Sequence, residues 1–97
     1  MIRQIVLVSF KPDTSDDQIT ECFDAMKEMC ESCEEVISFS LGKNIGDGPN
    51  HHDAALVADF EHIHALRRYT GGDKHRAYVE NYTRHVTAKL AAIQHKI

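Results

Sequence analysis

The chain alternates between short apolar runs and longer stretches whose apolar residues recur at helical spacing. The first run, residues 2–10, is rich in β-branched side chains and ends at Lys11-Pro12, which predicts a strand. Its side chains form two sets that face opposite ways: Gln4, Val6, Val8 and Phe10 on one side, Ile5 and Leu7 on the other. A strand that is apolar on both faces is covered on both faces. Because the chain is too short to supply a second sheet, we infer that a partner subunit covers one face.

The next stretch predicts an amphipathic helix that begins near Ser15 and reaches Cys33. Thr14 or Ser15 can cap its start, and Asp17 or Gln18 can take the third position of a capping box. Apolar residues then recur at helical spacing, while charged residues occupy the opposite side. The apolar set is Ile19, Cys22, Phe23, Met26, Met29, Cys30 and Cys33. We expect this helix to lie on a sheet.

The remaining elements follow from the same two periodicities. In chain order they are a strand at 36–41, a turn-rich loop at 42–50, a strand at 53–60, helices at 62–69 and from 75 to about 88, and a last strand at 90–97. The last strand is assigned because a four-stranded sheet needs it. The order β-α-β-β-α-β predicts a single domain, residues 1–97, with the ferredoxin-like α+β fold and an antiparallel four-stranded sheet.

Composition narrows the classes of function. The chain has 97 residues and a net charge of −4 with histidine neutral. Its lysines and arginines are scattered, which argues against binding to nucleic acid. No apolar run approaches the ~18 residues of a transmembrane helix, so we expect no membrane partner. An odd number of cysteines, three, is typical of reduced thiols, and we expect a cytoplasmic protein.

Neither the cysteines nor the paired histidines predict a metal site or a cofactor. Cys30 and Cys33 form a C-x-x-C sequence that closes a helix, whereas a redox motif opens a helix after a strand, so we interpret these thiols as structural. The adjacent pair His51-His52 directs its rings apart, as does the pair His62 and His64. No acidic residue or cysteine completes a set of metal ligands at either place.

Candidate chemistry is concentrated between Tyr69 and Tyr82. A Gly-Gly pair there precedes a helix on which His75, Tyr78 and Tyr82 share one face. A free histidine has a pKa of about 6.5, which suits a general base. The alternative is that His75 anchors the helix start through backbone hydrogen bonds. The tyrosines fit core or dimer packing with a polar tip.

Three segments together resemble the stress-responsive A/B barrel domain (Dabb) family, which belongs to the dimeric α/β barrel superfamily. The first is Met1–Pro12, a strand that ends in Phe-Lys-Pro. The second is Asp53–Glu61, which is similar to the third strand of the family. The third is Tyr69–Tyr82, with His75 at the second histidine of the family's run of tyrosines and histidines. Each motif is weak alone, but their order and spacing span nearly the whole chain.

The resemblance implies a homodimer in which two sheets pack face to face to form a barrel. It also implies a pocket between each sheet and its helices that takes a small aromatic or polyketide-like ligand. One plant member is a polyketide cyclase, and by resemblance His75 would be the base and Tyr69 its partner. The resemblance also gives candidate substrate-binding residues: Gln4, Phe23, Met26 and Tyr78.

The sequence departs from the family at two histidine positions. Gln4 and Ala54 stand where many members have histidine, and neither side chain transfers a proton. Three hypotheses therefore stay open. The first is a Dabb homodimer of unassigned activity with a small-molecule pocket. The second is a cyclase or isomerase that uses His75 as its base. The third is a relative of the cofactor-free monooxygenases.

Overall fold

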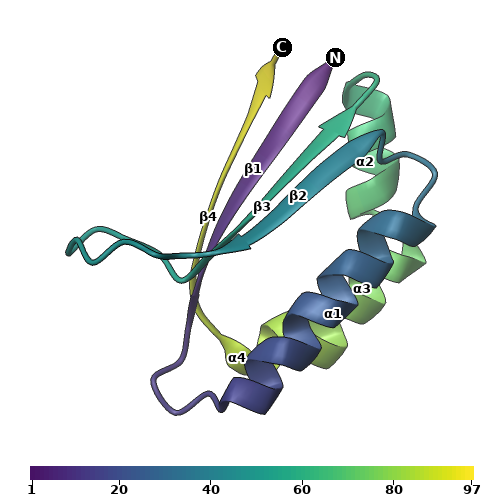
Figure 1. Cartoon of the computed structure of the whole chain (residues 1–97). Helices are drawn as coiled ribbons and strands as arrows, with labels where there is room; N and C mark the ends of the chain where they lie inside the picture. Colours follow the sequence, from purple (N-terminus) through teal and green to yellow (C-terminus); the bar gives the residue numbers. More distant parts are fainter.

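The computed structural model describes residues 1–97 and has the predicted order of strands and helices. The elements are β1 (Ile2–Phe10), α1 (Asp16–Ser32), β2 (Ser38–Lys43), β3 (Ala54–Phe60), α2 (Ile63–Thr70), α3 (Asp73–Tyr78), a π-helical turn η1 (Val79–Thr83), α4 (Arg84–Val86) and β4 (Thr87–Lys96). The strands form one antiparallel sheet in the order β2-β3-β1-β4. Figure 1 shows all the helices on one side of this sheet. The ferredoxin-like α+β prediction is confirmed.

The start of α1 is fixed by the capping box that the sequence predicts. The Ser15 hydroxyl accepts a hydrogen bond from the backbone N–H of Gln18 at 3.1 Å, and the Gln18 side chain accepts one from the Ser15 N–H at 2.9 Å. Asp16 and Asp17 in the first turn favour the positive end of the helix. These local contacts set the register of α1, and with it the side chains that face the sheet.

Three predicted strands have different bounds in the structure, and the one expected at 53–60 begins one residue later, at Ala54. The strand expected at 36–41 begins only at Ser38, because Val36 closes a turn by donating to the Cys33 carbonyl at 3.1 Å. The last strand was expected at 90–97 but spans Thr87–Lys96. Its first residue pairs with Phe10 of β1, so the preceding helical segment ends at Val86 rather than near residue 88.

The core lies between the sheet and the helices. Phe60 at the end of β3 is 0% exposed, and its ring lies 5.2 Å from the ring of Tyr69 on α2. Apolar residues of α1, β3 and α2 surround it: Met29, Cys30, Cys33, Leu56, Ala58, Ala65 and Leu66. A smaller cluster of Cys22, Met26 and Val86 continues the core toward α4. No helix is long and apolar enough to cross a membrane.

The other face of the sheet is not covered by any element of the chain (Figure 1). Cross-strand pairing places Val57, Ile5 and Ile93 in one row across this open face, and Ala55, Leu7 and Ala91 in the next. Ile93 is 59% exposed. β1 is therefore apolar on both faces, as the sequence indicates, but the chain supplies helices for only one of them.

Candidate functional site

A cavity of about 240 Å³ lies between the covered face of the sheet and the helices. Strands β1, β3 and β4 supply one wall, and α1, α2, α3 and η1 supply the other. Most of its lining is apolar, which is typical of small-molecule sites. Leu90 lines the cavity and is 54% exposed, so the opening is beside the edge strand β4. A larger hollow of about 530 Å³, near Lys11 and Asp53, has mostly polar walls.

His75 is half-buried in the wall of this cavity, near the start of α3. The edge of its ring faces the ring of Tyr69, with 5.3 Å between the ring centres. Burial lowers the pKa of His75, and no charged or hydrogen-bonding neighbour contributes to the shift. The imidazole is therefore neutral at neutral pH and is free to accept a proton. Backbone bonds, such as that from the Arg76 N–H to the Gly72 carbonyl, hold the helix start without the His75 side chain.

Tyr69 lines the cavity with its ring, while its hydroxyl points to α1. The residue is 2% exposed, and the hydroxyl donates to the Met29 sulfur at 3.8 Å. Burial, with a smaller contribution from Cys30, raises the pKa of Tyr69 far above its ordinary value. The phenol stays protonated, so Tyr69 does not act as a base and contributes a hydrogen-bonding hydroxyl and a packing surface.

Tyr78, the last residue of α3, behaves in the same way. Its hydroxyl lies 3.3 Å from the Cys22 sulfur, and its ring stacks on that of Tyr82 at 6.0 Å. Burial, and then the bond to Cys22, raise the pKa of Tyr78. Tyr69 and Tyr78 therefore both use their hydroxyls to join the helices to sulfur atoms of α1. Their rings remain available as cavity wall.

Gln4 is the polar group on the sheet side of the cavity. It is 7% exposed and lies directly opposite Gln94 in the pairing of β1 with β4. The Gln94 Nε2 donates a hydrogen bond of 2.7 Å to the Gln4 Oε1. A buried amide held in this way offers a directed hydrogen-bonding group inside an apolar space.

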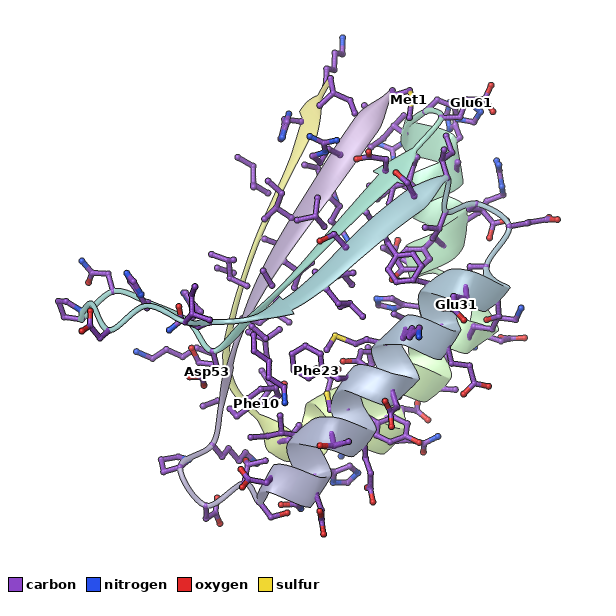
Figure 2. The ribbon with its side chains drawn as sticks, in the orientation of Figure 1. Met1, Phe10, Phe23, Glu31, Asp53 and Glu61 are labelled. Carbon is purple, nitrogen blue, oxygen red and sulfur yellow. The ribbon has the colours of Figure 1, made fainter.

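Of the two expected wall residues on α1, Met26 lines the cavity and Phe23 does not. The Phe23 ring lies 6.4 Å from that of Phe10, and the Lys43 ammonium lies 5.3 Å from its centre. Figure 2 shows Phe23 directed from α1 toward Phe10, between helix and sheet. Phe23 therefore closes the core near the end of β1, one helical turn before Met26.

Comparisons with known proteins agree with this architecture. The family model described as the stress responsive A/B barrel domain, Dabb, matches residues 2–96. The chain belongs to the Dabb family. No curated protein matches it.

Solved structures show the same fold at low identity to this Dabb chain. A dimeric ferredoxin-like protein of unknown function from Thermobifida fusca is 24% identical, with a TM-score of 0.88 over 99% of this chain and 90% of its own. A Dabb protein from Mesorhizobium loti is 19% identical, with a TM-score of 0.86 over 99% and 95%. The hydroxynitrile lyase from Passiflora edulis is 15% identical, with a TM-score of 0.88 over 99% and 92%.

The cysteines and paired histidines of this Dabb chain have structural contacts. The three cysteines are free and buried, and burial raises the pKa of the Cys30 thiol to about 11, which keeps it protonated and unreactive. The His62 side chain accepts from the Ala65 N–H at 3.3 Å and caps α2. His52 bonds to the Ser9 hydroxyl at 2.9 Å. No three histidine, cysteine or acidic side chains converge in a way that could hold a metal ion.

Sequence reasoning missed several cavity residues. Val79 and Thr83 belong to the π-helical turn, and no residue pattern predicted that turn. Leu90 and Ala92 line the cavity from β4, where alternation is weak. The contact between Gln94 and Gln4 was not predicted either. It follows once the register of β4 against β1 is known.

Proposed function

We propose that this Dabb protein binds a small, mostly apolar compound in the cavity beside His75 and that it works as a homodimer. The observation that carries the proposal is a cavity with mostly apolar walls that has His75 and Gln4 on opposite sides. In a mostly apolar cavity, a small number of polar groups at fixed positions orient the ligand that binds there. The free, buried cysteines favour a reducing compartment, the cytoplasm, as its location.

The size of the cavity supports a single-ring ligand. A cavity of about 150 Å³ holds benzene, so the 240 Å³ found here leaves room for one ring with a short substituent. The aromatic rings of Tyr69 and Tyr78 in the wall favour an aromatic ligand over an aliphatic one of the same size.

The homodimer is supported by the open face of the sheet. Its central rows are apolar, with Ile5 and Leu7 of β1 between apolar neighbours of β3 and β4. A contiguous exposed apolar patch of this kind is typical of an association surface. The Thermobifida fusca protein, which has the same fold, is described as dimeric. A second copy placed with its own open face against this one would cover both patches.

A catalytic role for His75 is the second candidate. A neutral, half-buried imidazole with no protein partner is suited to remove a proton next to the carbonyl group of a bound ligand. Gln4 across the cavity would then stabilise the negative charge that develops on the carbonyl oxygen. The hydroxynitrile lyase with this fold supports the idea that the scaffold accommodates an enzyme. A monooxygenase role requires aromatic walls beside Gln4 and Ala54, and Ala54 does not line the cavity.

Binding is tested by titrating the isotope-labelled protein with acetophenone and following backbone amide shifts by NMR. We expect shifts concentrated at Val79, Thr83 and Ala92, which line the cavity. His75→Ala should weaken binding by about tenfold, the cost of one polar contact, without changing the dimer mass. His64→Ala, at an exposed histidine on α2, is the matched control. Shifts that are absent at millimolar ligand, or scattered over the surface, would rule out the binding function.

Catalysis is tested with the same ligand in D₂O. A base that removes a methyl proton of acetophenone, with electron density moving onto the ketone oxygen, allows a solvent deuteron to replace it. We expect deuteration that depends on His75 and slows as pH falls through the pKa of that residue. If deuteration is no faster than in buffer, His75 is a binding residue and not a base.

A further inference from the structure

One hydrogen bond determines whether the buried Gln4 side chain turns its N–H group or its oxygen toward the cavity. Gln94 is the only side chain bonded to Gln4, and it donates Nε2 to the Gln4 Oε1 at 2.7 Å. The Gln4 Nε2, which carries two N–H donors, has no partner in the protein. No side-chain nitrogen or oxygen that is sealed from solvent lacks a hydrogen bond. The Nε2 group therefore reaches open space, and the cavity is the open space that Gln4 lines.

An amide N–H that faces an apolar cavity is unfavourable unless something accepts its hydrogen bond. Of the other polar groups in the wall, the hydroxyls of Tyr69 and Tyr78 lie against sulfur atoms of α1. The neutral imidazole of His75 carries one donor and one acceptor nitrogen, so it can pair with either kind of ligand and does not select between them. A ligand with an acceptor oxygen satisfies the Gln4 N–H, whereas a ligand that carries only a donor leaves it unpaired.

We propose that Gln94 is a positioning residue that turns the Gln4 amide so that the cavity selects ligands with an acceptor group such as a ketone or aldehyde oxygen. The inference rests on the proposed ligand-binding function and adds the chemical class of the ligand. Gln94 acts from the exposed surface of β4 and does not line the cavity. Because its own amide both donates and accepts, replacing it with a side chain that does only one of these fixes the orientation of Gln4.

The experiment compares two neutral ligands of similar size, acetophenone, which only accepts hydrogen bonds, and indole, which only donates one. In the wild-type protein we expect acetophenone to bind about tenfold more tightly than indole, the effect of one buried hydrogen bond. Gln94→Lys supplies a donor and should keep that ratio. Gln94→Glu supplies only an acceptor, so the Gln4 N–H should turn toward it and leave Oε1 facing the cavity. The preference should then reverse in favour of indole.

Two further readouts separate positioning from a general effect on the fold. Gln94→Ala removes the anchor, and the ratio of the two affinities should fall toward one. The side-chain amide resonances of Gln4 should shift on binding acetophenone in the wild type and in Gln94→Lys, but not in Gln94→Glu. Equal ratios in Gln94→Lys and Gln94→Glu, with both ligands still bound in the cavity, would overturn the inference and leave the binding function standing. If neither ligand enters the cavity of the wild type, the proposed function fails and the inference fails with it.

Discussion

The two faces of the sheet have similar patterns of apolar residues, but helices cover one face and leave the other exposed. Strand β1 sends Gln4, Val6 and Val8 to one face, where helices cover them. It sends Ile5 and Leu7 to the other, where nothing in the chain does. On the covered face the helices do not fill the space completely, and a cavity remains. The comparison teaches that a strand with apolar residues on both faces needs a packing layer on each face. The fold of a single chain provides only one of these layers, the helices.

The largest expected effect comes from removing the side chain of Phe60, which lies at the centre of the core on the covered face. Phe60→Ala should lower the free energy of unfolding by about 3–5 kcal/mol, because a large buried ring leaves a cavity behind. Chemical denaturation measures the change. Phe23→Ala, at a half-buried ring near the edge of the core, is the comparison and should cost less. Equal losses for the two variants would contradict the position assigned to Phe60.

The open face is tested by placing a charge at its centre. Ile5→Asp should raise the dissociation constant of the dimer by about 100-fold, because two buried carboxylates would lose their water on association. Analytical ultracentrifugation gives the mass, and circular dichroism checks that the monomer stays folded. Thr20→Asp, on the outer surface of α1, is the control and should leave the mass unchanged. A dimer that survives Ile5→Asp would mean that association uses another surface.

One end of the open face carries an ion pair whose effect on stability depends on pH. The Arg3 guanidinium donates to both carboxylate oxygens of Asp59, at 2.8 and 2.9 Å, and these bonds lower the pKa of Asp59. Because the folded pKa lies below the unfolded one, the stabilisation is complete above the unfolded pKa and is lost as pH falls through the folded value. Thermal unfolding between about pH 2 and 7 should show this loss in the wild type and less of it in Asp59→Asn. Identical acid profiles would show that the pair adds nothing.

The smallest expected effect comes from His75 on the covered face. Burial lowers its pKa from the ordinary 6.5, so the unfolded chain binds the proton more readily than the folded protein. Stability from this residue is complete above pH 6.5 and falls as pH drops toward the folded pKa, where the loss levels off. NMR titration should give His75 a pKa below the ordinary histidine value of 6.5. A His75 pKa above 6.5 would place the ring in a different environment.

The fold could be predicted because its signals are local. The cap at Ser15, the helical spacing along α1 and the β-branched run of β1 each specify one element without knowledge of the others. Five candidate residues from different parts of the sequence line the same cavity: Gln4, Met26, Tyr69, His75 and Tyr78. Their roles in binding and catalysis remain predictions.

The details that escaped prediction depend on contacts between distant parts of the chain. Phe23 is one helical turn from Met26, but the position of the sheet beneath α1 decides which of them reaches the cavity. The tyrosine hydroxyls turn to sulfur atoms of α1 because of how two helices pack. The bond between Gln94 and Gln4 joins residues 90 positions apart, and a shift of one residue in the pairing of β4 would place Gln94 on the other face.

Strand β4 is also an edge of the sheet, and this has a consequence for how copies of the protein meet. An edge strand of ten residues leaves a row of backbone donors and acceptors unpaired, and such a row recruits further strands. Lys89 and Lys96 lie within it, and like charges on two approaching edges repel each other. This repulsion opposes the addition of further strands at the edge and the growth of a fibre. Two copies are therefore favoured to associate in a closed assembly that has no free edge-to-edge contact.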